Sequence, residues 1–242
     1  GVPWYAMELL EGHTLKKVIE QLWGGSLRAS QLSRASTTMR ASPEDARGGQ
    51  EPRSQPVLPA RPLLELLLRL CAPLAYLHGC GLVHQDLKPG NIFIQRDGRV
   101  VLGDFGVAAE FGGAYGREVL KVDARGMGTA LYMAPEQSRG DFVDARADLY
   151  SLGCILYECV TGFPPFIGST SRAILRRHLQ EPVNPPSQLL GEPLPERLEW
   201  LILKLLEKRP EDRLGYAADV ARVLSELGVE DRTPARLPRP RI

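Results

Sequence analysis

The stretch LVHQDLKPGNIFIQRDGRVVLGDFG, residues 82–106, decides how the middle of this chain folds. It contains two short β-prone runs, at residues 92–95 and 99–102. The Asp97-Gly98 pair between them is typical of a tight two-residue turn. The stretch therefore predicts an antiparallel β-hairpin. The polar residues around this hairpin need a separate explanation.

Four polar side chains gather at the open end of this hairpin. A two-residue turn would place Asn91 opposite Asp104, and directly opposed residues have Cβ atoms about 4.5–5.5 Å apart. An amide oxygen and a carboxylate at that spacing can share a hard cation such as Mg²⁺. Asp86 enters the first strand from a short loop, and Lys88 adds a positive charge. Each alone would be an ordinary turn or surface residue, but together they predict a phosphoryl-transfer site.

These residues resemble the catalytic and magnesium loops of the eukaryotic-type (Hanks-type) protein kinases. HQDLKPGN (84–91), DFG (104–106) and APE (134–136) match that family's motif set. YAMELLEG (5–12) resembles the last small-lobe strand and the hinge, DLYSLGCILYECVTGFPPF the central large-lobe helix, and KRPEDR the late arginine-bearing turn. The DLKPGN form and Thr129 favour serine/threonine specificity, and APEQ is most similar to the bacterial members.

The resemblance implies an α+β, mostly α-helical fold: a kinase-like C-terminal lobe with a small catalytic β-hairpin. The kinase domain would cover residues 1–229, with the last small-lobe strand and hinge in 1–13 and the activation segment in 104–136. Residues 24–60 are rich in Ser, Arg, Pro and Gly, which predicts a flexible insertion. Residues 230–242 are basic and Pro-rich, as in a linker. Apolar patterns predict helices at residues 14–23, 61–78, 149–161, 170–180, 196–208 and 216–227.

The resemblance also implies a role for each site residue. Asp86 would accept the proton of the substrate hydroxyl, and Lys88 would contact the transferred phosphate. Asn91 and Asp104 would hold Mg²⁺, with Mn²⁺ as an alternative metal. The adenine of ATP would lie at the hinge and on an apolar floor, at Glu8, Leu10, Leu15 and Phe93.

Other residues would hold the loops in place rather than take part in the chemistry. Glu136 and Arg213 are expected to form an ion pair that stabilises the activation segment. Asp148 is expected to anchor the backbone of the catalytic loop. The full structural and regulatory set is His84, Gln85, Phe105, Gly106, Thr129, Glu136, Asp148 and Arg213.

Two departures from the family pattern affect the expected activity. No Gly-rich loop or V-A-I-K lysine precedes the hinge, and the chain begins at Gly1. We therefore expect a fragment of a longer kinase, inactive alone, with its small lobe and further domains outside these residues. Gln85 replaces the arginine before the catalytic aspartate, and no Ser or Thr lies between Asp104 and Gly128. A non-RD kinase that is not switched on by Ser/Thr phosphorylation of its activation segment is therefore expected.

Composition sets limits on partners and location. A net charge of +1 gives no argument for nucleic-acid binding, and no signal peptide or membrane span is visible. The cysteines lack metal-ligand spacing, so a cytoplasmic protein with buried free thiols is expected. The expected partners are protein substrates that carry Ser or Thr.

Two alternatives from other classes stay open. One is a catalytically inactive kinase-like protein (a pseudokinase) that acts as a binding or scaffold protein. The other is a small-molecule phosphotransferase with a kinase-like fold. The APE segment and Arg213 argue against the second, since in the family they build a platform for a peptide substrate.

Overall fold

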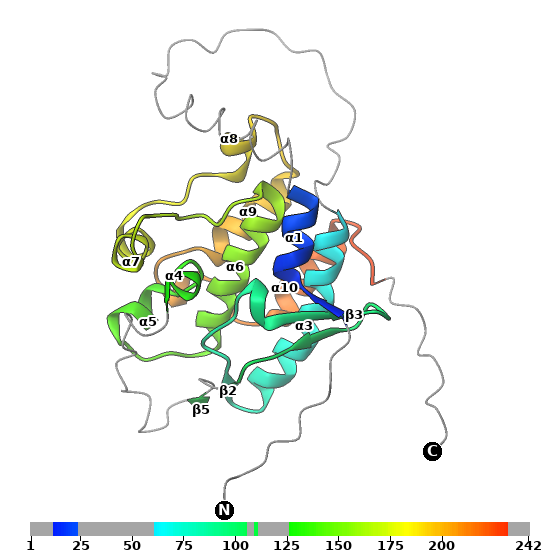
Figure 1. Cartoon of the computed structure of the whole chain (residues 1–242), viewed down its shortest axis with the longest axis horizontal. Coiled ribbons are helices and arrows are strands. Elements are labelled where there is room, and N and C mark those ends of the chain that lie inside the picture. Colours follow the sequence, from blue (N-terminus) through cyan, green and yellow to red (C-terminus); the bar gives the residue numbers. More distant parts are fainter. Residues whose placement is uncertain (1–11, 24–60, 106–108, 111–125, 232–242) are drawn as a thin grey trace, which may run out of the picture.

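The computed structural model describes residues 12–23, 61–105, 109–110 and 126–231. The expected strand before the hinge, the insertion at 24–60, most of the activation segment and the tail after Asp231 lie outside the described residues. Within the described part, the fold is mostly helical, with one three-stranded and one two-stranded sheet (Figure 1). The α+β, mostly helical class expected from the sequence agrees with this arrangement.

Helix α6 (Ala145–Thr161) is the centre of the hydrophobic core, and its residues from Ala147 onward are buried on every side. The Asp144 carboxylate caps its start by accepting a hydrogen bond from the Arg146 amide at 2.8 Å. Gly162, in the left-handed region with φ 81°, ends it. Gly153 lets α9 (Glu196–Leu205) approach closely, because a Cβ there would lie 2.7 Å from the Leu205 Cβ.

Three more helices complete this core. Helix α3 (Arg61–Gly79) buries its leucines at the spacing that the sequence predicted, and α10 (Ala217–Glu226) packs against it. Helix α1 (Leu15–Trp23) buries Leu15 and Ile19, and its Trp23 indole donates to the Cys159 carbonyl of α6 at 3.1 Å. The helices predicted from apolar periodicity are therefore confirmed, including α7 (Ser171–Gln180).

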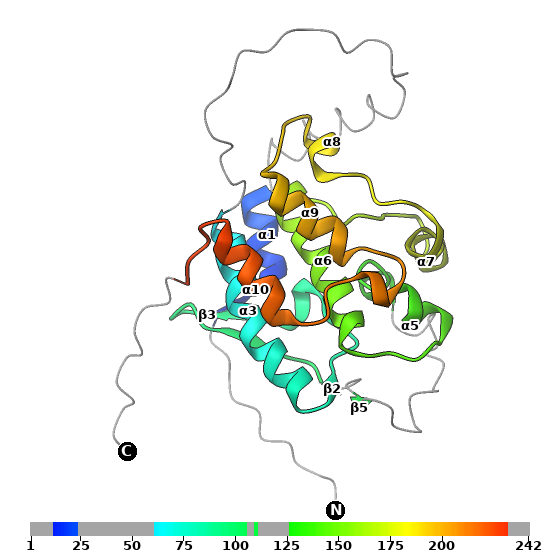
Figure 2. The same ribbon diagram turned by 180° about the vertical axis from the view of Figure 1, so that it is seen from behind.

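In the part of the chain that the structure describes, three further helices were not predicted from the sequence. They are α4 (Gly126–Ala130), α5 (Pro135–Arg139) and α8 (Pro186–Leu190), and each has five residues, too few to show a helical period. Figures 1 and 2 show α4, α5 and α7 together on one side of α6, with the β-hairpin on the other side. The 3₁₀ turns η1 (Pro89–Asn91) and η3 (Pro210–Asp212) connect longer elements.

The small sheet carries the predicted hairpin, but its register is different. Strand β3 (Ile92–Gln95) pairs with β4 (Val100–Leu102) and with β1 (Gly12–Thr14), both antiparallel. Gln95 pairs with Arg99, so the loop has three residues, and of these only Gly98 has a positive φ, at 81°. Phe93 therefore pairs with Val101. The predicted two-residue turn, with Asn91 directly opposite Asp104, is wrong.

A second, two-stranded sheet joins β2 (Leu82–Val83) to β5 (Ala109–Glu110) in antiparallel pairing. Strand β2 leads directly into the predicted catalytic loop, and β5 belongs to the predicted activation segment. The two segments are therefore tied together just before the loop begins.

The cysteines are free thiols, as the sequence indicated. Cys71, Cys154 and Cys159 are buried, but Cys80 is exposed, so the expectation of burial fails there. No helix in the described ranges has the length and apolar character needed to span a membrane.

Candidate active site

The polar residues of the predicted catalytic loop form one hydrogen-bonded group. Lys88 Nζ donates to Asp86 Oδ2 at 2.7 Å and to the Thr129 hydroxyl at 3.0 Å. Asn91 Nδ2 donates to the Asp86 carbonyl at 2.9 Å and to Asp86 Oδ2 at 3.1 Å. Asp86 therefore has one carboxylate oxygen bound by a lysine and an amide, while α4 supplies Thr129 from the far end of the activation segment.

The backbone before Asp86 is held in an unusual conformation. Gln85 has φ 64°, a region that costs a non-glycine residue about 1–3 kcal/mol when occupied. Asp148, fully buried in α6, accepts from the His84 amide at 2.8 Å and from the Gln85 amide at 2.9 Å. The same carboxylate accepts from His78 Nε2 at 2.9 Å. Asp148 thus lies where the sequence analysis expected an anchor for this loop.

Asn91 and Asp104 lie at the same end of the hairpin without facing each other. The Gly103 amide donates to the Asn91 carbonyl at 2.9 Å, so Gly103 is the residue opposite Asn91. Asp104 follows at φ 60° and is exposed. The positive φ turns the chain just before this carboxylate. The structure therefore brings both residues to one edge by a different route from the predicted one.

The packing residues of the site differ in their exposure. The His84 ring is buried, donates from Nε2 to the Gly103 carbonyl at 3.0 Å, and lies 5.1 Å from the Phe105 ring. Phe105 is 49% exposed, so it covers one side of His84 without being part of the core. The expectation of purely internal packing for Phe105 is therefore wrong.

The expected adenine contacts are described only in part. Leu15 is fully buried in the hydrophobic core, so it offers no surface to a ligand and its assignment to the adenine floor is wrong. It faces inward because it shares the apolar stripe of α1 with Ile19. Phe93 keeps partial exposure on β3. Glu8, Leu10 and Gly106 lie outside the described residues.

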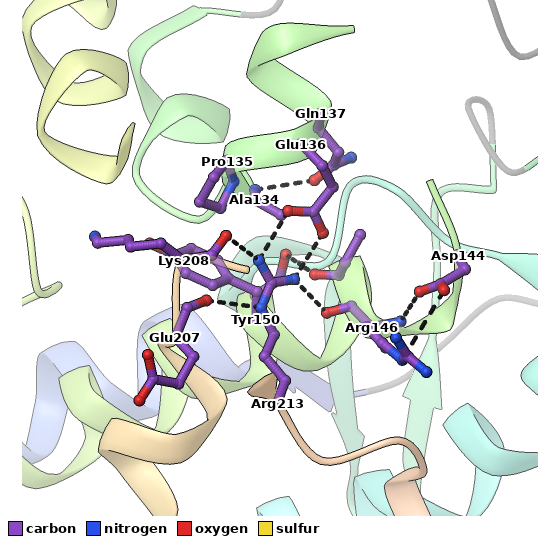
Figure 3. A network of polar contacts seen from close by, with 12 residues as sticks. Ala134, Pro135, Glu136, Gln137, Asp144, Arg146, Tyr150, Glu207, Lys208 and Arg213 are labelled. Carbon is purple, nitrogen blue, oxygen red and sulfur yellow. Dashed lines mark hydrogen bonds and ion pairs between the residues drawn. The ribbon is translucent and has the colours of Figure 1, made fainter. Parts of the chain in front are cut away.

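Arg213 and Glu136 are joined in a buried ion pair (Figure 3). The guanidinium donates to both Glu136 oxygens, at 2.6 and 2.8 Å, and lies over the Tyr150 ring with its Cζ 4.8 Å from the ring centroid. It also donates to the carbonyls of Arg146 at 2.9 Å and Glu207 at 2.8 Å. The pair thereby fixes α5, which begins at the end of the predicted activation segment, to α6 and η3.

Sequence reasoning missed two residues of this region. Gln137, in α5, donates from Nε2 to the Gln85 carbonyl at 2.8 Å, and His78 contacts Asp148. The sequence signal for Gln137 is its position directly after APE, which indicates similarity to the bacterial members but no contact with another loop. His78 lies at the end of α3 and carried no separate signal.

The comparison with known proteins decides the family. The protein kinase domain model matches residues 50–224, which is more than half of the chain. The chain belongs to the protein kinase family. Its similar curated relatives are bacterial serine/threonine kinases, so this kinase domain is of the Hanks type found in bacteria.

Two of these relatives give the extent of the match. The serine/threonine-protein kinase PknB of Mycolicibacterium smegmatis is 42% identical over 165 residues, 68% of this chain and 26% of that protein. A probable serine/threonine-protein kinase of Streptomyces coelicolor is 41% identical over 167 residues, 69% of this chain and 24% of that protein. The kinase domain described here thus spans about a quarter of the length of these curated relatives.

Proposed function

We propose that this chain is the catalytic large lobe of a protein kinase that transfers the γ-phosphate of ATP to Ser or Thr hydroxyls of protein substrates. The proposal rests on one observation, the unequal environment of the two carboxylate oxygens of Asp86. Oδ2 accepts from Lys88 and Asn91. Oδ1 is buried and has no hydrogen-bond partner among the described residues.

A buried acceptor without a donor costs about 1–3 kcal/mol, so Oδ1 is suited to receive a hydrogen bond from a substrate. A Ser or Thr hydroxyl supplies that donor. In the reaction, the hydroxyl oxygen bonds to the γ-phosphorus, the bond from the γ-phosphorus to the bridging oxygen breaks, and ADP leaves. The hydroxyl proton passes to Asp86, which positioned the nucleophile.

Lys88 would neutralise charge on the transferred phosphoryl group. Its ammonium carries three donors, and the described contacts use two of them, for Asp86 and Thr129. The two hydrogen bonds fix the direction of the third N–H group, so the lysine is held in one orientation before the substrate binds. Fixed charge that needs no reorganisation is the main contribution a protein makes to phosphoryl transfer.

The donor set at the hairpin edge fits Mg²⁺. The Asn91 amide nitrogen is committed to Asp86, which turns its oxygen away from that residue. Asp104 is exposed, with no hydrogen bond or ion pair to another described residue. One carboxylate and one amide oxygen suit a hard cation that takes its other ligands from phosphate and water. When bound, Mg²⁺ would offset the negative charge of the nucleotide phosphates.

The experiment measures transfer of ³²P from ATP to a mixed protein substrate by the longest natural protein that contains these 242 residues. Asp86→Asn and Asp104→Asn are compared with wild type, and Asp219→Asn, at a half-exposed position of α10, is the matched carboxylate control. We expect losses of at least about 10²-fold for the first two variants and wild-type activity for the control.

The phosphorylated residues are then identified by mass spectrometry. Phosphoserine and phosphothreonine are expected. Wild-type transfer that persists in Asp86→Asn would overturn the assignment of the base. Binding of ATP without any transfer would favour the pseudokinase alternative, and transfer only to small molecules would favour the phosphotransferase alternative.

A further inference from the structure

Gln137 is a buried amide whose two ends serve different parts of the molecule. It lies on α5 and is 5% exposed. Its Oε1 accepts from the Ala134 amide at 3.0 Å, which satisfies the start of the helix (Figure 3). Its Nε2 donates to the Gln85 carbonyl at 2.8 Å. One side chain therefore joins α5 to the loop that carries Asp86.

The peptide group between Gln85 and Asp86 depends on this contact. Its carbonyl is held by Gln137 and its amide donates to His84 Nδ1 at 3.3 Å. The amide bonds to Asp148 secure the loop only up to the nitrogen of Gln85. Because Gln85 is held at φ 64°, relaxation of this peptide would lower the local strain and turn Asp86 away from its present orientation.

We propose that Gln137 is a positioning residue that sets the orientation of Asp86 through the Gln85 carbonyl and couples it to the placement of α5. This inference rests on the proposed function, because it concerns the residue that receives the substrate proton. Glu136, the preceding residue, fixes α5 through its ion pair with Arg213. Gln137 therefore links the loop of Asp86 to a helix that is itself held in place.

Only a side-chain amide of this length meets both requirements. A glutamate at 137 could still accept from the Ala134 amide, but its ionised carboxylate would face the Gln85 carbonyl with no proton to donate. A methionine of similar length could do neither. The two replacements thus separate the contact to the loop from the contact within the helix.

The first arm of the experiment measures amide hydrogen exchange in the 242-residue chain, for Gln137→Glu, Gln137→Met and Gln188→Glu. Gln188 is an exposed residue of α8, so its replacement adds the same charge elsewhere. We expect exchange in residues 82–88 to become about tenfold faster in both Gln137 variants, the effect of one lost buried hydrogen bond. Residues 134–139 should exchange faster only in Gln137→Met.

The glutamate variant also provides a pH test. A buried carboxyl group that faces a carbonyl oxygen has a raised pKa, and once protonated it can donate to that oxygen. At each pH the variant is compared with wild type, so the intrinsic pH dependence of exchange cancels. Lowering the pH from about 8 to about 6 should return the exchange of residues 82–88 toward the wild-type value in Gln137→Glu and leave Gln137→Met unchanged.

The second arm measures kinetics in the longest natural protein that contains this sequence. Gln137→Glu should lower kcat about tenfold or more and leave the KM for ATP within about twofold, because a small displacement of the base affects the chemical step. The ratio of variant to wild-type kcat should rise as the pH falls. Loss of stability alone would lower kcat without this pH-dependent recovery.

Each outcome decides a separate statement. Unchanged exchange in residues 82–88 would overturn the role of Gln137 in holding the loop. Altered exchange with unchanged kcat would overturn its role in positioning Asp86. A wild-type protein without transfer activity would overturn the proposed function, and the catalytic role of Gln137 with it, while the exchange arm would still decide whether Gln137 holds the loop.

Discussion

Arg213 and Glu136 form a two-point buried ion pair although 77 positions separate them in the sequence. Their side chains are 0% and 3% exposed. A buried charge is costly unless its partner and hydrogen bonds are complete. Here the remaining guanidinium donors reach the carbonyls of Arg146, Glu207 and Lys208. The pair therefore holds α5, α6 and η3 together as one unit.

Removal of Arg213 should destabilise the fold strongly. Arg213→Ala leaves Glu136 buried without a counter-charge and leaves three carbonyls without their donor, so we expect a loss of about 3–5 kcal/mol in the free energy of unfolding. Urea denaturation of the 242-residue chain measures it. Arg222→Ala is the matched control, since the pairs of Arg222 with Asp219 and Glu226 are exposed and their loss should cost at most about 1 kcal/mol.

The partner variant tests the same statement from the other side. Glu136→Gln removes the negative charge but keeps the shape, so Arg213 is left as an unpaired buried cation and the loss should approach that of Arg213→Ala. Equal, small losses in Arg213→Ala and Arg222→Ala would show that the pair does not hold these elements together.

His178 should make the fold less stable in mild acid. Burial, together with the nearby Lys208 charge, lowers the pKa of His178 to about 3, and the Tyr150 hydroxyl is 2.8 Å from its Nδ1. The ring also packs edge-on against Phe166, with centroids 4.9 Å apart. In the unfolded chain the histidine binds a proton below its ordinary pKa of about 6.5, whereas in the folded chain it stays neutral until about pH 3. Stability is therefore lost as the pH falls through this window.

The size of the effect follows from the two pKa values. Between pH 7 and pH 5 the contribution of His178 should be a loss of about 2 kcal/mol in the free energy of unfolding. His178→Gln can still form a hydrogen bond with the Tyr150 hydroxyl. In urea denaturation over the same pH interval, its free energy of unfolding should fall by about 2 kcal/mol less than that of wild type. His13→Gln is the control, because His13 is exposed on β1. Parallel pH profiles for wild type and His178→Gln would contradict this account.

The core could be predicted from the sequence because its signal is periodic. The leucines of α3, at 63, 67, 70, 74 and 77, are all buried, as their spacing indicated. A helix needs only one apolar stripe, and many residues contribute to the pattern. The hairpin register, by contrast, depended on a single position. Asp97-Gly98 is compatible with a two-residue turn, but only Gly98 adopts a positive φ, and this shifts every pair by one.

Site residues that belong to one short sequence motif could be predicted from the sequence. Site residues that are positioned by tertiary contacts could not. Asp86, Lys88 and Asn91 are close together because they share one short loop. Leu15 was predicted to line the adenine floor. It lies instead on the apolar face of α1 with Ile19, and this face packs into the core. The contact of Gln137 with the loop could not be predicted, because its partner Gln85 lies 52 positions away and the position after APE does not indicate a partner at that distance.

Thiol labelling should distinguish Cys80 from the other cysteines. Cys71, Cys154 and Cys159 are buried, and burial raises the pKa of the Cys71 thiol to about 12, which removes its reactive thiolate at neutral pH. We expect the native chain to take up one equivalent of iodoacetamide at pH 8, at Cys80, and four in urea. Cys80→Ser should abolish native labelling. Peptide mass spectrometry that finds Cys154 or Cys159 modified in the native chain would contradict this packing.

The activity of the proposed kinase should not depend on phosphate in its activation segment. An activation-segment phosphate orders that segment only where cations converge on it, and Gln85 stands where kinases of the RD type have an arginine. Gln85 instead contributes its backbone, through its amide to Asp148 and its carbonyl to Gln137. Phosphatase treatment of the longest natural protein that contains this chain should therefore leave kcat within about twofold of the untreated value. Gln85→Arg should not make activity depend on phosphate, because no Ser or Thr lies between Asp104 and Gly128. Gln188→Arg serves as the charge-matched control. A large loss of wild-type activity after phosphatase, mapped to Tyr115 or Thr129, would show that this segment is ordered by phosphate after all.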